Sequence, residues 1–384
     1  MKIVHTNKAY YPLIGGVETI VANIVEGLAS VKRTGVELLV CNNLHSFSIK
    51  RKLINGVNVT YVPMWMKIAS LPISPSYPFY LLKFKGDIIH IHEPFPLADI
   101  SVLLFLPFIR KNFSRIVVSW HSDIVRQKWA LWIYSFLLHS FLKKVDLIIV
   151  ATPNHISSSK FLQRYSQKCE IIPYGLKLDW VNDAESRYNE VKSIREKYGT
   201  PLLLFVGRLV YYKGIKYLVD ALVSLPNVNL IIIGTGPLYN ELQNQINSNG
   251  LGERVSILCN VSDSDLYSFY EACDIFVLPS TEPSEAFGLV QVEAMACGKP
   301  VVSTNLGTGV SFVNQNGITG ITVQPRDSKA LAEAINLLIV DSSFRETLGK
   351  NAKYRAFKEF NVESMVEKVF NTYEILLNGN AKKK

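Results

Sequence analysis

The stretch 274–304 restricts the fold of this chain more than any other part of the sequence. An apolar run, Asp274–Leu278, comes before a loop, and a second apolar run, Val301–Thr304, follows a helical segment that stops at Gly298 and Pro300. Glycine just past a helix and proline beyond it are typical stop signals. Two short buried strands joined by a helix are expected to be parallel, with a right-handed crossover. The pattern predicts an α/β fold with a ligand site at the loop after the first strand.

Two carboxylates lie in this stretch. Glu285 falls in the loop, and Glu293 falls about two turns along a helix predicted from Gly288 to Cys297. A carboxylate can accept hydrogen bonds from two neighbouring hydroxyls, as in a sugar or a ribose. A lone Glu is more often a solvated surface acid, but the predicted ligand edge favours binding roles for both. The helix start offers phosphate the backbone amides of Phe287, Gly288 and Leu289.

The length of 384 residues fits two domains of about 150–200 residues each. Apolar runs alternate with helical patterns through both halves, which predicts two Rossmann-like domains with parallel sheets. Strands are expected at Lys2–His5, Val36–Cys41, Val57–Pro63, Asp87–His92, Ile116–His121, Leu147–Ala151, Pro201–Gly207 and Leu230–Ile233. Helices are expected near the end of the chain at Asp327–Ile339, Phe344–Phe357 and Val362–Leu377.

The cysteines and the first residues favour a cytoplasmic protein. The five cysteines are scattered, without the spacing of a metal site or a disulfide framework. The first residues read as a strand rather than a signal peptide, and no run of about 18 apolar residues could span a bilayer. We therefore expect reduced thiols, no metal and no membrane-spanning helix.

Positive charge is concentrated in the first half of the chain. Residues 1–175 carry 20 Lys and Arg against 9 Asp and Glu, whereas residues 176–384 carry 21 against 23. A basic region can indicate nucleic acid, anionic lipid or phosphorylated substrates. Here the basic residues are interleaved with large apolar side chains, which favours an anionic membrane surface over nucleic acid. The aromatic, Lys-flanked segments are Met64–Leu71, Tyr77–Lys85, Leu103–Phe113 and Arg126–Lys144. We expect 64–85 to meet the membrane; 126–144 fits a core helix equally well.

Other candidate site residues follow predicted strands. Gly15 and Gly16 precede a helix, where glycine lets the backbone approach a phosphate. Arg208 and Lys213 lie in the loop after a strand, where their charges could stabilise a leaving diphosphate. His121 ends a strand, where a structural hydrogen bond is the usual alternative to a catalytic role. His90, His92 and Glu93 lie at another strand end, where they could contact the acceptor.

The spacing Glu285-x7-Glu293, followed by Ala-Met-Ala-Cys-Gly-Lys-Pro-Val-Val, resembles the signature of the retaining glycosyltransferases of family 4. The resemblance extends over most of the chain. It implies the GT-B architecture, two Rossmann-like domains facing each other across a cleft, with a C-terminal helix that crosses back to the first domain. The expected boundaries are 1–175 with 362–384 for an acceptor- and membrane-facing domain, and 176–361 for a nucleotide-sugar-binding domain.

The resemblance also implies roles for individual residues. Gly15 and Gly16 would lie against the donor diphosphate, and His121 near the 6-hydroxyl of the sugar. Glu285 would grip the donor sugar and Glu293 the ribose, while Arg208 and Lys213 would neutralise the leaving diphosphate. Nucleotide contacts are implied for Gly234, Gly236 and the backbone around Val261, although Cys259 stands where the family has glycine.

The expected activity is metal-independent, retaining transfer of a hexose from GDP-mannose or a UDP-hexose. The expected acceptor is a saccharide on a polyprenyl diphosphate lipid, at the inner face of the cytoplasmic membrane, in the synthesis of a surface polysaccharide such as O-antigen. A UDP-hexose or HexNAc transferase with a different acceptor and an inactive nucleotide-sugar-binding partner subunit are the alternatives. Epimerases of the same fold lack the Glu-x7-Glu spacing.

Overall fold

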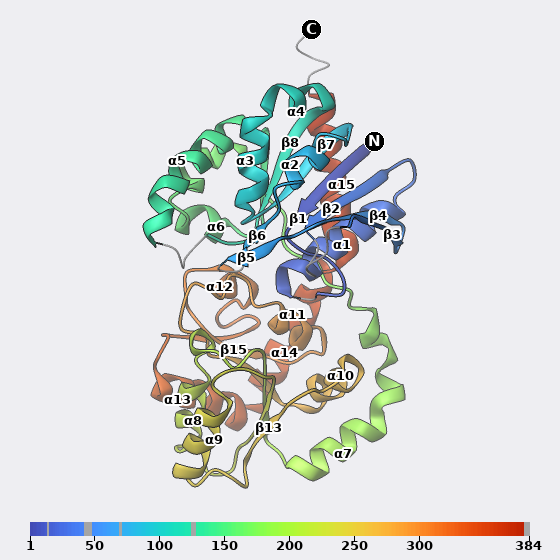
Figure 1. Cartoon of the computed structure of the whole chain (residues 1–384). Helices are drawn as coiled ribbons and strands as arrows, with labels where there is room; N and C mark the ends of the chain where they lie inside the picture. Colours follow the sequence, from blue (N-terminus) through green and yellow to red (C-terminus); the bar gives the residue numbers. More distant parts are fainter. Residues whose placement is uncertain (14, 42–47, 69–70, 124–127, 380–384) are drawn as a thin grey trace. The chain divides into compact units, whose positions relative to one another are not determined.

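A computed structural model describes residues 1–13, 15–41, 48–68, 71–123 and 128–379 (Figure 1). The chain forms two compact units. Unit 1 comprises Met1–Gly175 together with the residues from Val362 onward, and unit 2 comprises Leu176–Asn361. Each unit has its own sheet and its own layers of helices, as the Rossmann-like prediction requires.

Unit 1 contains an eight-stranded sheet in the order β10-β9-β8-β7-β1-β2-β4-β3. All neighbouring strands are parallel except β3, which runs antiparallel to β4. The strands are β1 (Lys2–Asn7), β2 (Gly35–Cys41), β3 (Lys50–Ile54), β4 (Val57–Val62), β7 (Gly86–Glu93), β8 (Phe113–Trp120), β9 (Leu147–Val150) and β10 (Cys169–Ile171). A separate hairpin pairs β5 (Met66–Ile68) with β6 (Leu71–Ile73).

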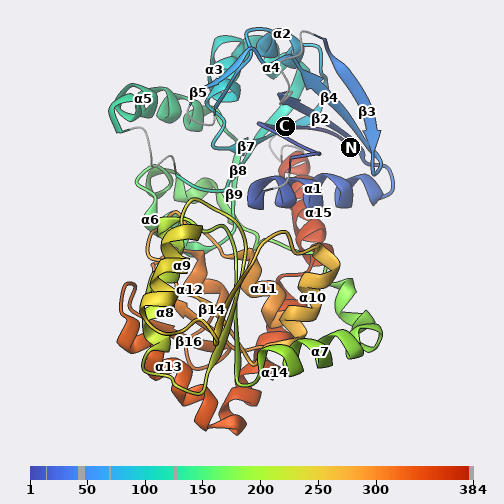
Figure 2. The ribbon, with the colours of Figure 1, turned by 60° about the horizontal axis from the view of Figure 1, so that its bottom comes forward.

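Helices cover both faces of this sheet. One face carries the apolar core, in which Ile89 and Ile91 of β7 pack with buried residues of α2 (Tyr77–Leu81), α3 (Pro96–Leu104), α4 (Leu106–Asn112) and α5 (Lys128–Lys144). Side chains alternate along a strand, so His90 points to the other face. There α15 (Val362–Asn378) supplies Tyr373, and α15 packs beside α1 (Gly16–Ser30), as Figures 1 and 2 show. Two short segments, α6 (Pro153–Ser158) and a 3-10 stretch Leu162–Lys168, lead to β10.

The aromatic segments divide between core and surface. Leu138 and Phe141 of α5 are buried, whereas Phe136 is 75% exposed, so the described side chains of this helix include a core face. Residues 126–127 and the side chains of 128–133 lie outside the described part. In the segment 64–85, Tyr77 is buried but Trp65 and Phe79 are 58% and 61% exposed. None of the described helices has the length and apolar character needed to cross a membrane.

Unit 2 contains a six-stranded, wholly parallel sheet in the order β13-β12-β11-β14-β15-β16. Its strands are β11 (Leu202–Val206), β12 (Asn229–Ile233), β13 (Val255–Leu258), β14 (Ile275–Leu278), β15 (Val301–Thr304) and β16 (Gly320–Val323). Its helices are α7 (Tyr188–Tyr198), α8 (Ile215–Leu222), α9 (Tyr239–Ser248), α10 (Asp263–Ala272), α11 (Leu289–Ala296), α12 (Gly309–Val313), α13 (Ser328–Val340) and α14 (Ser342–Glu359), with 3-10 stretches at Asp179–Arg187 and Tyr211–Lys213.

The strand order of unit 2 places a topological switch point between β11 and β14. From β11 the chain builds outward through β12 to β13, and from β14 it builds the opposite way through β15 to β16. In open α/β sheets, ligands bind outside the carboxyl ends of the strands at such a point. The predicted strand–loop–helix–strand unit is β14, α11 and β15, whose parallel pairing confirms the prediction.

Candidate functional site

Two loops of unit 2 meet at the switch point. The loop 207–214 follows β11, and the loop 279–288 follows β14. The amide of Thr281 donates to the carbonyl oxygen of Tyr212 at 2.7 Å. Gly214 adopts a φ of +66°, and a Cβ atom there would lie 2.0 Å from the carbonyl oxygen of Pro279. Only glycine can occupy this position, because any side chain would push the two loops apart.

The contact between these loops brings together Lys213 and Glu285. Their side chains form an ion pair with an Nζ–Oε2 distance of 2.5 Å. Both residues are buried, at 9% and 8% exposure. The hydroxyl of Ser280 donates to the same Oε2 atom at 3.1 Å, and the Thr308 hydroxyl donates to the Glu285 carbonyl oxygen at 2.8 Å. Both side-chain contacts therefore end on one carboxylate oxygen, Oε2, while Thr308 holds the backbone of Glu285.

Arg208 has a different environment from Lys213. Its side chain is exposed, and among the described residues no carboxylate lies within ion-pair distance of it. The Lys213–Glu285 pair is close to neutral, so Arg208 is the uncompensated positive charge of this loop. The Lys213 ammonium still has two N–H donors besides the one directed at Glu285.

The loop after β12 packs directly against the loop after β11. A Cβ atom at Gly234 would lie 1.9 Å from the carbonyl oxygen of Gly207, and one at Gly236 would lie 2.4 Å from that of Leu209. The predicted nucleotide-contact glycines thus allow two backbones to touch. After β13, Val261 is half-buried and Cys259 is exposed, with its thiol 3.5 Å from the Gly234 carbonyl oxygen.

The start of α11 forms another part of the site in unit 2. Gly288 is the N-cap, with a φ of +73°, and Leu289 is the first helical residue. Phe287 is buried before them. Glu293 accepts a hydrogen bond from the Tyr270 hydroxyl at 2.6 Å, and burial raises the pKa of Glu293 to about 7. Sequence analysis missed Tyr270, Ser280 and Thr308, since hydroxyl side chains have no spacing that marks them as carboxylate partners.

In unit 1, the predicted glycines lie at the start of a helix that follows the carboxyl end of β1. Gly15 is the N-cap of α1, with no side-chain cap, and Gly16 is its first residue. A Cβ atom at Gly15 would lie 2.5 Å from the carboxylate of Glu18. The backbone amides of this helix start are a suitable site for an anion.

His121 belongs to a group of four buried imidazoles, which we call the histidine row: His5, His90, His92 and His121. The β1–β7 register aligns His5 with His90, and His92 follows two residues later on the same face. His92 lies between two neighbours, with Nε2 3.1 Å from Nδ1 of His5 and Nδ1 3.1 Å from Nε2 of His121.

Both ring nitrogens of His121 are occupied, because its Nδ1 atom lies 2.7 Å from the Tyr174 hydroxyl. A ligand that binds His121 through its ring must displace Tyr174 or His92. His90 contacts the Tyr373 hydroxyl and lies 2.8 Å from the Ser119 hydroxyl oxygen. The sequence analysis predicted His121, His90 and His92 as candidate site residues. Nothing in the sequence indicated that His5 and Tyr174 contact them.

Burial keeps the histidine row neutral. Desolvation lowers the pKa of His5 to about 3 and holds those of His90, His92 and His121 well below the usual value of 6.5. Neighbouring imidazoles contribute to the shifts at His90, His92 and His121, and Lys8 and His155 contribute at His121.

Three histidines of the row lie close enough together to ligate one metal ion. Ligand atoms of His5, His90 and His92 lie within 4.8 Å of one another. Within the described residues, however, only the Nε2 atom of His5 lacks a partner among these ring nitrogens. A metal ion bound here would have to displace the existing hydrogen bonds. The expectation that the chemistry needs no metal stays a prediction.

Comparison with known proteins identifies relatives of the whole chain. The family described as Glycosyltransferase Family 4 matches residues 14–180, and that described as Glycosyl transferases group 1 matches residues 186–355. The O-antigen chain mannosyltransferase C of Escherichia coli is 33% identical, covering 99% of this chain and 100% of the relative. The D-rhamnosyltransferase WbpZ of Pseudomonas aeruginosa is 33% identical, covering 92% of this chain and 91% of its own.

Solved structures share the fold. Anabaena HepE in complex with UDP superposes with a TM-score of 0.77 and 23% identity, covering 97% of this chain and 100% of that one. A sucrose-phosphate synthase from Thermosynechococcus elongatus superposes with a TM-score of 0.75 and 24% identity, covering 98% and 99%. These likenesses confirm the predicted GT-B fold class.

The histidine row makes the stability of unit 1 dependent on pH. A histidine whose pKa is lowered by folding stabilises the folded state above pH 6.5, and this stabilisation is lost as the pH falls toward the folded pKa. The folded pKa of His5 is about 3. Protonation of this one residue in the unfolded state should therefore lower the free energy of unfolding by about 2–3 kcal/mol as the pH falls from 7 to 4.5. Hydrogen exchange of β1 and β7 amides, corrected for intrinsic rates, measures the loss.

His5→Asn should reduce this pH dependence, since the amide removes one titrating group yet keeps a polar atom near the Nδ1 position. His139→Asn on α5 is the control, because His139 lies outside the row. Equal pH slopes in wild type and His5→Asn would show that His5 does not become charged on unfolding in this range.

Proposed function

The chain belongs to the glycosyltransferases of family 4, and we propose that it transfers a hexose, with mannose favoured, from a nucleotide sugar to a lipid-linked saccharide. The observation that carries the proposal is the buried Lys213–Glu285 pair at the switch point of unit 2, with the exposed Arg208 on the same loop. The names of two full-length relatives, a mannosyltransferase and a D-rhamnosyltransferase, support a deoxyhexose or hexose donor in polysaccharide synthesis.

In this proposal unit 2 holds the donor. The Oε1 atom of Glu285 accepts hydrogen bonds from hydroxyls of the sugar, because the Lys213 and Ser280 contacts both end on Oε2. Glu293 accepts the ribose hydroxyls, and the amides of Phe287, Gly288 and Leu289 bind phosphate. The loop containing Gly234 and Gly236 and the backbone at Val261 receive the nucleotide. GDP-mannose is the favoured donor, and a UDP-hexose is the alternative.

Arg208 and Lys213 have separate tasks in the departure of the nucleotide. Arg208 supplies a full positive charge to the diphosphate, while Lys213 orients Glu285 and donates its remaining N–H groups. From unit 1, Gly15 and Gly16 contribute amides to the diphosphate, and His121 assists at the sugar. The acceptor oxygen forms its bond to the anomeric carbon on the face that the diphosphate leaves, and the departing phosphate takes the acceptor proton. Configuration is thus retained.

The proposed place of action is the inner face of the cytoplasmic membrane, with a polyprenyl-diphosphate-linked saccharide as acceptor. Exposed aromatic side chains at Trp65 and Phe79 and the net charge of +11 on residues 1–175, from 20 basic and 9 acidic residues, support contact with anionic lipid. The name of one full-length relative, an O-antigen chain mannosyltransferase, supports the same acceptor class.

Arg208→Ala tests the proposed chemistry most directly. We expect kcat to fall about 10²–10³-fold, since a charge aimed at the leaving group is lost. The melting temperature should not change, because Arg208 is exposed and forms no ion pair with described residues. Lys216→Ala, which removes an exposed charge from the start of α8, is the matched control and should retain activity. Transfer should also survive EDTA. Activity of Arg208→Ala within a few-fold of wild type would remove this residue from the site.

The buried pair needs a different design, because Lys213→Met or Glu285→Gln alone leaves a buried charge without its partner. Each single change should cost about 3–5 kcal/mol of stability. The double variant should recover much of that stability but not the activity. Thermal shifts with GDP and UDP sugars would report donor binding in each variant. Recovery of transfer by the double variant would contradict a catalytic role for the pair.

Glu293 predicts how donor use depends on pH. With a pKa of about 7, its ionised form should bind the ribose better, so kcat/KM for the donor should fall about 10-fold from pH 8 to pH 6. Tyr270→Phe removes a hydrogen bond that lowers this pKa, so the acid limb should move to higher pH. Glu293→Gln should flatten the limb. An unchanged limb in both variants would assign the titration to another group.

Membrane contact is tested by the paired change Trp65→Ser and Phe79→Ser. Flotation with vesicles that contain anionic lipid should show affinity lowered about 10-fold, since two apolar side chains no longer enter the interface. Tyr354→Ser, which alters a 66% exposed aromatic residue of unit 2, is the control. Undiminished flotation of the paired variant would place the membrane contact elsewhere.

A further inference from the structure

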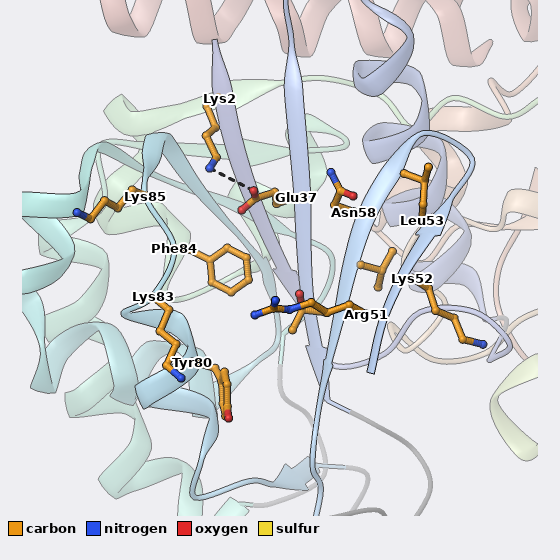
Figure 3. A pocket seen from close by; sticks show the side chains of 12 residues that line it. Lys2, Glu37, Arg51, Lys52, Leu53, Asn58, Tyr80, Lys83, Phe84 and Lys85 are labelled. Carbon is orange, nitrogen blue, oxygen red and sulfur yellow. Dashed lines mark ion pairs between the residues drawn. The ribbon is translucent and has the colours of Figure 1, made fainter. Parts of the chain in front are cut away.

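A basic groove lies in unit 1, apart from every residue discussed above as a donor contact. Its volume is about 590 Å³. Figure 3 shows it between the β3–β4 hairpin on one side and the segment 80–85 on the other. The groove is lined by five basic residues, Lys2, Arg51, Lys52, Lys83 and Lys85, by Glu37, and by polar and aromatic side chains.

The groove belongs to the amino-terminal end of the parallel strands. Lys2 is the first residue of β1, and Lys85 directly precedes β7. Gly15, Gly16 and His121 instead follow the carboxyl ends of β1 and β8. Since β1 has six residues, the two ends of the sheet are roughly 20 Å apart. The groove is therefore a separate feature of unit 1.

The groove lies where helix α2 ends beside the sheet. On the face that carries the apolar core, α2 ends at Leu81, and residues 82–85 return to β7. Glu37 on β2 and Thr60 on β4 share a face with the core residues Leu39 and Val62, two positions further along their strands. The polar ends of these strands thus form an open floor beside the packed core.

The charge of the groove is unbalanced. Lys2 pairs with Glu37 at 3.1 Å, which accounts for the single acid. Among described residues, no carboxylate lies within ion-pair distance of Arg51, Lys83 or Lys85. Like charges around a concave, partly apolar wall reinforce one another and attract a counter-ion. An anion in the groove would remove this repulsion.

The side chains also have the geometry of a binding site. In Figure 3, Arg51 extends across the groove toward Tyr80 and Phe84, and the ammonium of Lys83 lies 4.4 Å from the centre of the Tyr80 ring. Lys52 points away from the other cations, as expected for the residue next to Arg51 on a strand. A guanidinium binds phosphate with two parallel hydrogen bonds, and a lysine adds a point charge.

We propose that this groove is a binding site for a phosphate group carried by a small ligand. Arg51 and Lys83 bind the phosphate oxygens. Asn58 and Thr60 supply hydrogen-bonding groups, and Tyr80 and Phe84 provide flat walls for the rest of the ligand. A volume of about 590 Å³ accommodates more than a bare phosphate. Two sources carry this chemistry, an anionic phospholipid headgroup and a soluble phosphorylated compound. The site does not depend on the proposed transfer reaction.

Arg51→Ala compared with Lys50→Ala tests the proposal, because both remove one charge from β3 and only Arg51 lines the groove. Both should be made in an Arg208→Ala background, which weakens binding of phosphate probes to unit 2. Calorimetry with inorganic diphosphate tests the soluble source. Flotation with phosphatidylcholine vesicles, with and without phosphatidic acid, tests the lipid source.

Arg51→Ala should weaken binding of the diphosphate, the phosphatidic acid vesicles or both by at least 10-fold, while Lys50→Ala stays within about twofold. A loss in calorimetry alone assigns a soluble ligand, and a loss in flotation alone assigns a headgroup. Equal binding by the two variants in both assays overturns the proposal. Transfer activity in the wild-type background is a separate measurement, so a failure of the proposed function would not resemble a failure of this site.

Discussion

The buried ion pair between Lys213 and Glu285 is the interaction on which the organisation of unit 2 depends. Removing two charges from water is costly, and apolar residues of similar size often give equal or greater stability. The pair therefore makes most sense as part of a binding site. It joins the loops that leave β11 and β14, the two strands on either side of the switch point. The close approach at Gly214 and the hydroxyls of Ser280 and Thr308 all maintain this one contact.

Unit 1 contains a polar interior of another kind. Its histidine row places four imidazoles on one face of a buried sheet, where their shared hydrogen bonds leave one ring nitrogen, on His5, without a partner among the described residues. A row of neutral imidazoles has coupled tautomers, because each ring can donate at one nitrogen and accept at the other. The state of His121 is then set by His92 and Tyr174 as much as by any ligand.

Parallel strands, helix boundaries and the candidate loops were within reach of sequence reasoning, because apolar runs and glycine stops are local signals. α11 begins one residue after the predicted Gly288 start. Strand β3 was missed because Lys50, Arg51 and Lys52 show no apolar alternation on an exposed edge. The contact of Lys213 with Glu285 and that of Tyr270 with Glu293 join different elements, and a single sequence contains no record of such pairings. The exposure of Trp65 likewise depends on which other segments pack against it, and the sequence alone does not give that packing.

The two ends of the strands in unit 1 can serve different ligands, because a parallel sheet is chemically asymmetric. Its carboxyl ends present Gly15, Gly16 and His121 through loops and a helix start, where the fold can hold an anion without a fixed charge. The crossover helices of a parallel sheet begin beyond the carboxyl ends of its strands, so an anion at the amino ends needs side-chain cations. Arg51, Lys83 and Lys85 supply such charges. Part of the positive charge of residues 1–175 is thus concentrated in a concave groove instead of being spread over the surface. A non-specific attraction to anionic membranes would not require a concave site.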